Sequence, residues 1–69
     1  MKANIGKYDV NAIADNAHGG FAGTAHYHWD EGGVTLFNKI RFEKVFATED
    51  EAKRHALEQF EICVRDGAL

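Results

Sequence analysis

The chain has 69 residues, a formal net charge of −3 with neutral histidines, and 45% hydrophobic residues. This length allows one small domain over residues 1–69, and the acidic balance argues against a non-specific nucleic-acid binder, which usually has a basic excess. No apolar run approaches the ~20 residues that cross a bilayer, and the N-terminus lacks the apolar segment of a signal peptide. Cys63 is the only cysteine, which excludes an intrachain disulfide. Together these features predict a cytoplasmic domain without membrane contact.

The first predicted strand covers residues 8–15. Weakly apolar and polar positions alternate along it with the period of two that is typical of a strand with one buried face. The expected inner positions are Tyr8, Val10, Ala12 and Ala14. Residues 16–20, which end in two glycines, are expected to form the loop to the next strand.

Residues 21–30 show the clearest strand pattern in the chain. One face has the apolar or small residues Phe21, Gly23, Ala25, Tyr27 and Trp29. The opposite face has Ala22, Thr24, His26, His28 and Asp30. This alternation is typical of an antiparallel strand with one face on the core and one in water. We therefore expect Trp29 to lie under a covering element, and His26 and His28 to face water.

A hairpin is predicted at residues 30–33, since glycine supplies the positive φ of tight turns, and the next strand follows over about 34–46. If Asp30 lies opposite Gly33, the inner face pairs apolar residues, with Trp29 against Val34 and Tyr27 against Leu36. Asn38 is then an inner polar residue opposite Ala25. A β-bulge near Phe37 and Asn38 would relieve this mismatch.

The last predicted element is an amphipathic helix that starts after Thr48. Thr48 and Glu51 have the spacing of a capping box, and Gly67 is placed to end the helix. The apolar stripe consists of Ala52, Ala56, Phe60, Cys63 and Val64. The predicted fold class is therefore α+β, a three-stranded antiparallel meander with one C-terminal helix packed on one face.

One helix covers only one face of such a sheet, so the other face and the sheet edges are the expected sites of function. The predicted interaction surface comprises His26, His28, Phe37, Lys39 and Arg41. The leading hypothesis is a non-catalytic module that binds protein, including a second copy of itself, through this face or through an edge strand.

Two alternatives to protein binding use the same face. Lys39, Arg41 and the histidines could contact nucleic acid, although Asp30 and Glu43 lie on the same strands. His26, His28 and Asp30 lie at i, i+2 and i+4, and two imidazoles with a carboxylate could ligate a divalent metal.

Catalysis and cofactor binding are not predicted. The chain has no serine and no phosphate-binding glycine motif, and Cys63 falls on the apolar helix stripe, where a thiol is normally inert. The expectation is a protein that is not an enzyme and has no cofactor.

The aromatic strand Phe21–Asp30 and the segment 46–52, which opens the helix, resemble features of small β-β-β-α domains in uncharacterised bacterial proteins. The similarity extends over roughly residues 8–66 and implies the same fold. It transfers no functional residues.

Overall fold

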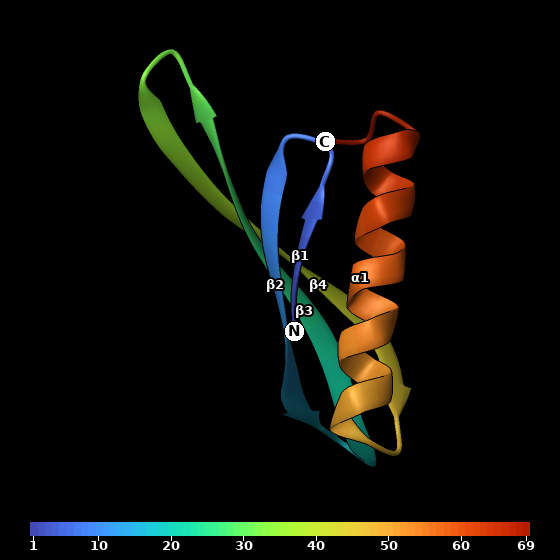
Figure 1. Cartoon of the computed structure of the whole chain (residues 1–69). Helices are drawn as coiled ribbons and strands as arrows, with labels where there is room; N and C mark the ends of the chain where they lie inside the picture. Colours follow the sequence, from blue (N-terminus) through green and yellow to red (C-terminus); the bar gives the residue numbers. More distant parts are fainter.

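The computed structural model describes residues 1–69 as an antiparallel sheet with one helix on one of its faces (Figure 1). The elements are β1 (Lys2–Ile5), β2 (Tyr8–Ala17), β3 (Gly20–Glu31), β4 (Val34–Phe46) and α1 (Glu49–Arg65). The strands lie in the order β1-β2-β3-β4, each antiparallel to its neighbour. The α+β class and the C-terminal helix are confirmed. The predicted number of three strands is wrong, because the sheet has four. The single helix has 17 residues, and it lacks the length and apolar character needed to cross a membrane.

The additional strand is β1, which forms a hairpin with β2. Ile5 pairs with Tyr8, so Gly6 and Lys7 form the turn between the two strands. Within β1, Ala3 and Ile5 are partly buried whereas Lys2 and Asn4 are exposed. This alternation is present in the sequence, but four residues are too few for a period of two to stand out.

The hairpin between β3 and β4 turns one residue later than predicted. Gly32 and Gly33 both have positive φ, and Glu31 pairs directly with Val34. The predicted pairing is therefore wrong by two residues, since Trp29 lies opposite Leu36 and not opposite Val34. A shift of two residues preserves the face of every side chain, so the division into inner and outer faces is unaffected.

The irregularity in the β3–β4 ladder also lies elsewhere than predicted. The register shifts between Ala22 and Thr24, which pair with Val45 and Arg41. Between these two pairs, β4 contains two more residues than β3. Because this excess is even, the inner and outer faces of the two strands still match. No shift occurs at Phe37 or Asn38. Asn38 lies on the inner face, where it remains exposed beyond the helix.

Helix α1 begins and ends as its sequence predicts. The Glu51 amide donates to the Thr48 hydroxyl at 3.2 Å, and that hydroxyl donates to the Glu51 carboxylate at 3.0 Å. At the other end, the amides of Gly67 and Ala68 donate to the carbonyls of Val64 and Cys63. These two bonds form a Schellman motif, which satisfies carbonyls that the helix itself leaves unpaired.

The core lies between α1 and the inner faces of β2 and β3. Gly23 allows the closest approach, since a Cβ at this position would lie 2.2 Å from the carbonyl oxygen of Ala52. Around Phe60, which is fully buried, Tyr8 and Tyr27 pack with ring centroids 5.6 and 4.7 Å away. Trp29 is only partly buried and stacks on Tyr27 at the end of this cluster.

The enclosed position of Tyr27 has an electrostatic consequence. Burial raises the pKa of its phenol above the ordinary value of 10.0, and the neighbouring Tyr8 raises this pKa further. The Asn38 side chain, which lies opposite on β4, acts in the other direction. Tyr27 is therefore a neutral packing residue over the physiological pH range.

Candidate interaction surface on the outer sheet face

The outer face of the sheet is the surface opposite α1, and its side chains lie in rows across all four strands. One row runs from β1 to β4 through Asn4, Asp9, His28 and Phe37. The adjacent row contains Lys2, Asn11, His26 and Lys39. Each row contains residues that are distant in sequence, because the antiparallel register places them opposite one another.

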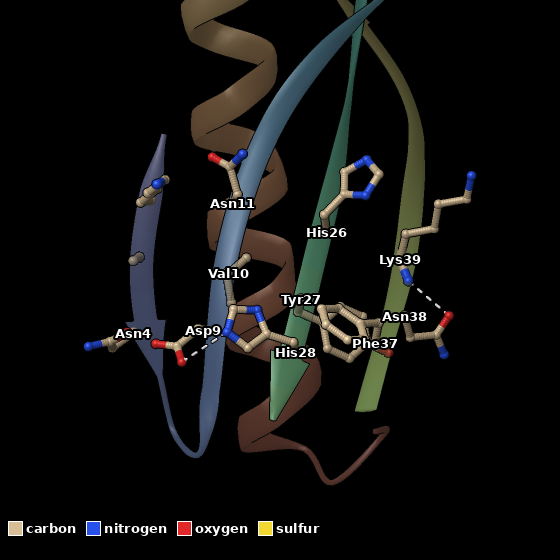
Figure 2. A pocket seen from close by; sticks show the side chains of 12 residues that line it. Asn4, Asp9, Val10, Asn11, His26, Tyr27, His28, Phe37, Asn38 and Lys39 are labelled. Atoms are coloured by element: carbon tan, nitrogen blue, oxygen red, sulfur yellow. Dashed lines mark hydrogen bonds and ion pairs between the residues drawn. The ribbon is translucent and has the colours of Figure 1, made fainter. Parts of the chain in front are cut away.

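These two rows line a shallow groove of about 920 Å³ (Figure 2). We call it the outer groove. Its lining also includes Ala3, Val10, Tyr27 and Asn38. A smaller hollow of about 410 Å³ continues from it along β2, β3 and β4. The residues around this second hollow are Ile13, Asp15, Thr24, His26, Lys39 and Arg41. The predicted surface residues therefore form one continuous area.

Phe37 is the main apolar feature of the outer groove. Its side chain is 76% exposed, the largest value among the exposed large hydrophobic residues of the chain. It pairs across the strands with His28, and the two ring centroids are 5.6 Å apart. The expectation that Phe37 belongs to an exposed outer surface is confirmed, and Val45 on the same strand is also exposed, to 42%. An exposed aromatic residue in a hollow is typical of a contact site.

His28 is held on its other side by β2. Its Nε2 atom lies 3.3 Å from the Asp9 carboxylate, an ion pair when the imidazole is protonated (Figure 2). Both side chains are about half exposed, so water screens this pair and its contribution to stability is small. Its effect is on geometry, because it orients the imidazole between Asp9 and Phe37.

The charged groups of the outer groove give it a cationic bias. Lys2 and Lys39 line it together with a single carboxylate, that of Asp9. His26 is exposed between Asn11 and Lys39 and would add positive charge on protonation. The chain as a whole has a net charge of −3, so the acidic excess lies outside this groove.

Beside the outer groove, one carboxylate is engaged within the sheet. Asp15 accepts a hydrogen bond of 2.7 Å from the hydroxyl of Thr24, which is almost completely buried. Arg41 pairs with Thr24 across β3 and β4 and lies at the edge of this area. The cationic surface thus extends along β4 from Lys39 to Arg41.

The histidines do not form a three-residue metal site with Asp30. No group of three or more histidine, cysteine, aspartate or glutamate side chains is arranged to hold a metal ion. Asp30 instead accepts a 2.7 Å hydrogen bond from the Thr35 hydroxyl near the hairpin turn. The carboxylate next to His28 is that of Asp9, which the linear spacing of residues 26–30 could not reveal.

The β3 and β4 residues of this surface follow from the sequence pattern, whereas its β1 and β2 side does not. Lys2, Asn4, Asp9 and Asn11 all line the groove. Asp9 and Asn11 were recognisable as outer-face residues of the first predicted strand. Their position beside the histidines depends on the pairing of β2 with β3, which alternation alone does not specify.

Comparisons with protein-family models, curated proteins and solved structures found no match to this chain. The geometry of the molecule is therefore the basis for a functional assignment.

Proposed function

We propose that this chain is a non-catalytic interaction module whose outer groove binds a segment of another protein. The main supporting observation is the exposure of Phe37 inside a hollow on the face that α1 leaves uncovered. An aromatic side chain exposed to water in this way favours association, because a partner that covers it removes apolar area from water. Burial of apolar area contributes about 25 cal/mol per Å².

The charge of the groove indicates the chemistry of the partner segment. Lys39 is on the same strand as Phe37, Lys2 lines the opposite side of the groove on β1, and Asp9 is the only carboxylate in the lining. A segment with an apolar side chain next to acidic residues would match both features. Complementary charges of this kind favour association and make it sensitive to salt.

The test is affinity capture from lysate with the unmodified chain, Phe37→Asp and Val45→Asp, with the captured proteins quantified by mass spectrometry. Val45 is the matched control, because it is an exposed apolar residue of the same strand outside the groove. We expect one set of proteins to be lost with Phe37→Asp, retained with Val45→Asp and released by salt. Equal capture by all three chains would exclude the groove as the binding site.

Nucleic acid is a second candidate ligand, favoured by one specific arrangement. Phe37 and His28 lie together on an open antiparallel sheet, with Lys39 and Arg41 beside them. Single-stranded nucleic acids bind sheets by stacking bases on aromatic side chains next to cations. The carboxylates of Asp9 and Asp15 on the same face would repel phosphate groups, which argues against nucleic acid as the ligand.

Fluorescence anisotropy with a labelled single-stranded oligonucleotide tests whether the chain binds nucleic acid. Binding that weakens steeply with salt and disappears in Phe37→Asp would establish nucleic acid as the ligand. No change in anisotropy at low salt would remove this candidate.

A further inference from the structure

The edge of the sheet at β4 borders the outer groove, and Phe37 and Lys39 belong to both. β4 has 13 residues and pairs only with β3, so its other side has no strand beside it. An edge strand presents unpaired amide and carbonyl groups that can accept a further strand. Proline, a common device against such pairing, is absent from the chain.

The turn geometry determines which residues of β4 present these groups. Gly32 and Gly33 form a two-residue turn with positive φ at both positions, and the flanking pair Glu31–Val34 is then a hydrogen-bonded pair. Because bonded and non-bonded pairs alternate along an antiparallel ladder, the odd-numbered residues direct their amides and carbonyls away from β3. These residues are Thr35, Phe37, Lys39 and Arg41.

A hydrogen bond in the structure agrees with this alternation. The Lys39 amide donates to the side-chain oxygen of Asn38 at 2.8 Å and not to β3 (Figure 2). The side-chain oxygen of Asn38 thus accepts from a backbone amide on the edge, at the place where the carbonyl oxygen of an added strand would accept. The donor becomes available as soon as the Asn38 amide rotates away.

We propose that two copies of the chain pair through their β4 edges, antiparallel, with the two-fold axis at Asn38. Phe37 then lies opposite Lys39 of the second copy, and Thr35 lies opposite its Arg41. All four of these residues have outward-directed backbone groups, so they form hydrogen-bonded pairs. The product is a continuous eight-stranded sheet, the closed two-fold arrangement that is commonest among homo-oligomers.

The side chains of β4 favour this register over its neighbours. On the inner face Leu36 meets Ile40 of the second copy and Val34 meets its Phe42, so apolar residues lie opposite apolar residues. On the outer face the Lys39 ammonium lies beside the Phe37 ring, a cation–π arrangement. Both faces of the new junction are therefore complementary.

The neighbouring two-fold registers have a defect at the axis or beside it. In an antiparallel pair, side chains directly opposite each other lie on the same face of the sheet. Even-numbered residues therefore pair with even-numbered ones and odd with odd, so the two-fold axis passes through a residue and not between two residues. An axis at Lys39 places two lysines opposite each other, and one at Ile40 places Lys39 opposite Arg41. An axis at Phe37 places Leu36 opposite Asn38.

The helix leaves room for a second copy. α1 packs mainly against β2 and β3, and the far end of the β3–β4 hairpin extends away from the helix (Figure 1). The edge from Val34 to Arg41 is therefore accessible. This contact depends on the backbone groups of β4, whereas the proposed function depends on the Phe37 side chain, so either proposal can fail without the other.

Disulfide trapping tests the register, with Cys63→Ser as the background. At the axis, Asn38→Cys forms a non-hydrogen-bonded pair with Cα atoms about 4.5 Å apart, within the range for a disulfide. Thr35→Cys is the matched control on the same strand, since the two copies of residue 35 lie six positions apart, about 20 Å at the rise of a strand.

We expect Asn38→Cys to give a covalent dimer on mild oxidation and Thr35→Cys alone to stay monomeric. A mixture of Thr35→Cys and Arg41→Cys should give the mixed disulfide. Equal cross-linking of Asn38→Cys and Thr35→Cys, or cross-linking through Phe37→Cys in place of Asn38→Cys, would overturn the proposed register.

Sedimentation of the unmodified chain over roughly 10–500 μM, a range that covers weak association, tests the dimer without cysteine chemistry. Thr35→Pro removes one edge amide and Thr35→Ala retains it, while both lose the hydroxyl bond to Asp30. We expect dimers for the unmodified chain and Thr35→Ala, and monomers for Thr35→Pro. Val45→Asp should remain dimeric, since Val45 lies on β4 outside the paired edge. A monomer at every concentration of the unmodified chain would refute the proposal.

Discussion

Replacing Phe60 by alanine should unfold this domain at room temperature. Phe60 is the only large side chain that is fully buried, and it contacts the rings of both Tyr8 and Tyr27. Truncating a buried phenylalanine to alanine costs about 3–5 kcal/mol. A core of this size rarely supplies more than roughly 3–5 kcal/mol of net stability. The substitution therefore removes most or all of the free energy of unfolding.

The assay is urea unfolding followed by far-ultraviolet circular dichroism, with Phe60→Leu and Ile62→Ala as graded controls. Phe60→Leu keeps most of the volume and should cost less than about 1.5 kcal/mol. Ile62 is 37% exposed on the same helix, so Ile62→Ala should change the stability by no more than about 0.5 kcal/mol. If Phe60→Ala kept a cooperative transition and lost less than about 1 kcal/mol of the free energy of unfolding, Phe60 would not be the central residue of the core.

Three further predictions concern the helix, the sheet and pH. Thr48→Ala removes the side chain that caps α1 and should cost about 1 kcal/mol in thermal unfolding, whereas Thr35→Ala on the exposed hairpin should cost less. Gly23→Ala places a Cβ 2.2 Å from the Ala52 carbonyl oxygen and should cost about 1–3 kcal/mol or more, measured by urea unfolding. Tyr27 should ionise above pH 10.0 when absorbance at 295 nm is followed, and because its pKa is raised in the folded state, stability should fall as the pH rises from this value.

Each of these expectations has an outcome that contradicts it. Equal losses of stability in Thr48→Ala and Thr35→Ala would show that the capping hydrogen bonds do not stabilise α1. A Gly23→Ala chain as stable as the unmodified one would mean that α1 can move away from β3. Ionisation of Tyr27 at the pH of a free tyrosine would show that its ring is accessible to water.

The two proposed contacts give the molecule two adjoining surfaces with different requirements. The outer groove needs the Phe37 side chain and the lysines that line it, whereas the edge needs the backbone of β4 in a regular extended form. Pairing of two β4 edges would also bring two outer grooves onto one continuous sheet. A partner with two binding segments would then bind more tightly than one with a single segment, because the second segment binds at a high effective concentration.

Local patterns in the chain determined the helix and the faces of its main strands. The spacing of Thr48 and Glu51 specified the start of α1, since a capping box involves only neighbouring residues. Alternation over residues 21–30 assigned Tyr27 to the core and His26 to water, whereas Ala22 and Thr24, which it placed on the water-facing side, are buried. These features depend on interactions within a few residues, which the order of the chain contains directly.

Only the tertiary structure determined the pairing between strands. The turn could lie at residues 31–32 or 32–33 with the same alternation, and the two choices differ by two residues in every cross-strand pair. The observed choice places His28 beside Phe37, and the pairing of β2 with β3 brings Asp9 to its other side. The groove exists because β1, β2, β3 and β4 lie side by side in one register, and that register is set by pairing between strands, which no short stretch of the sequence displays.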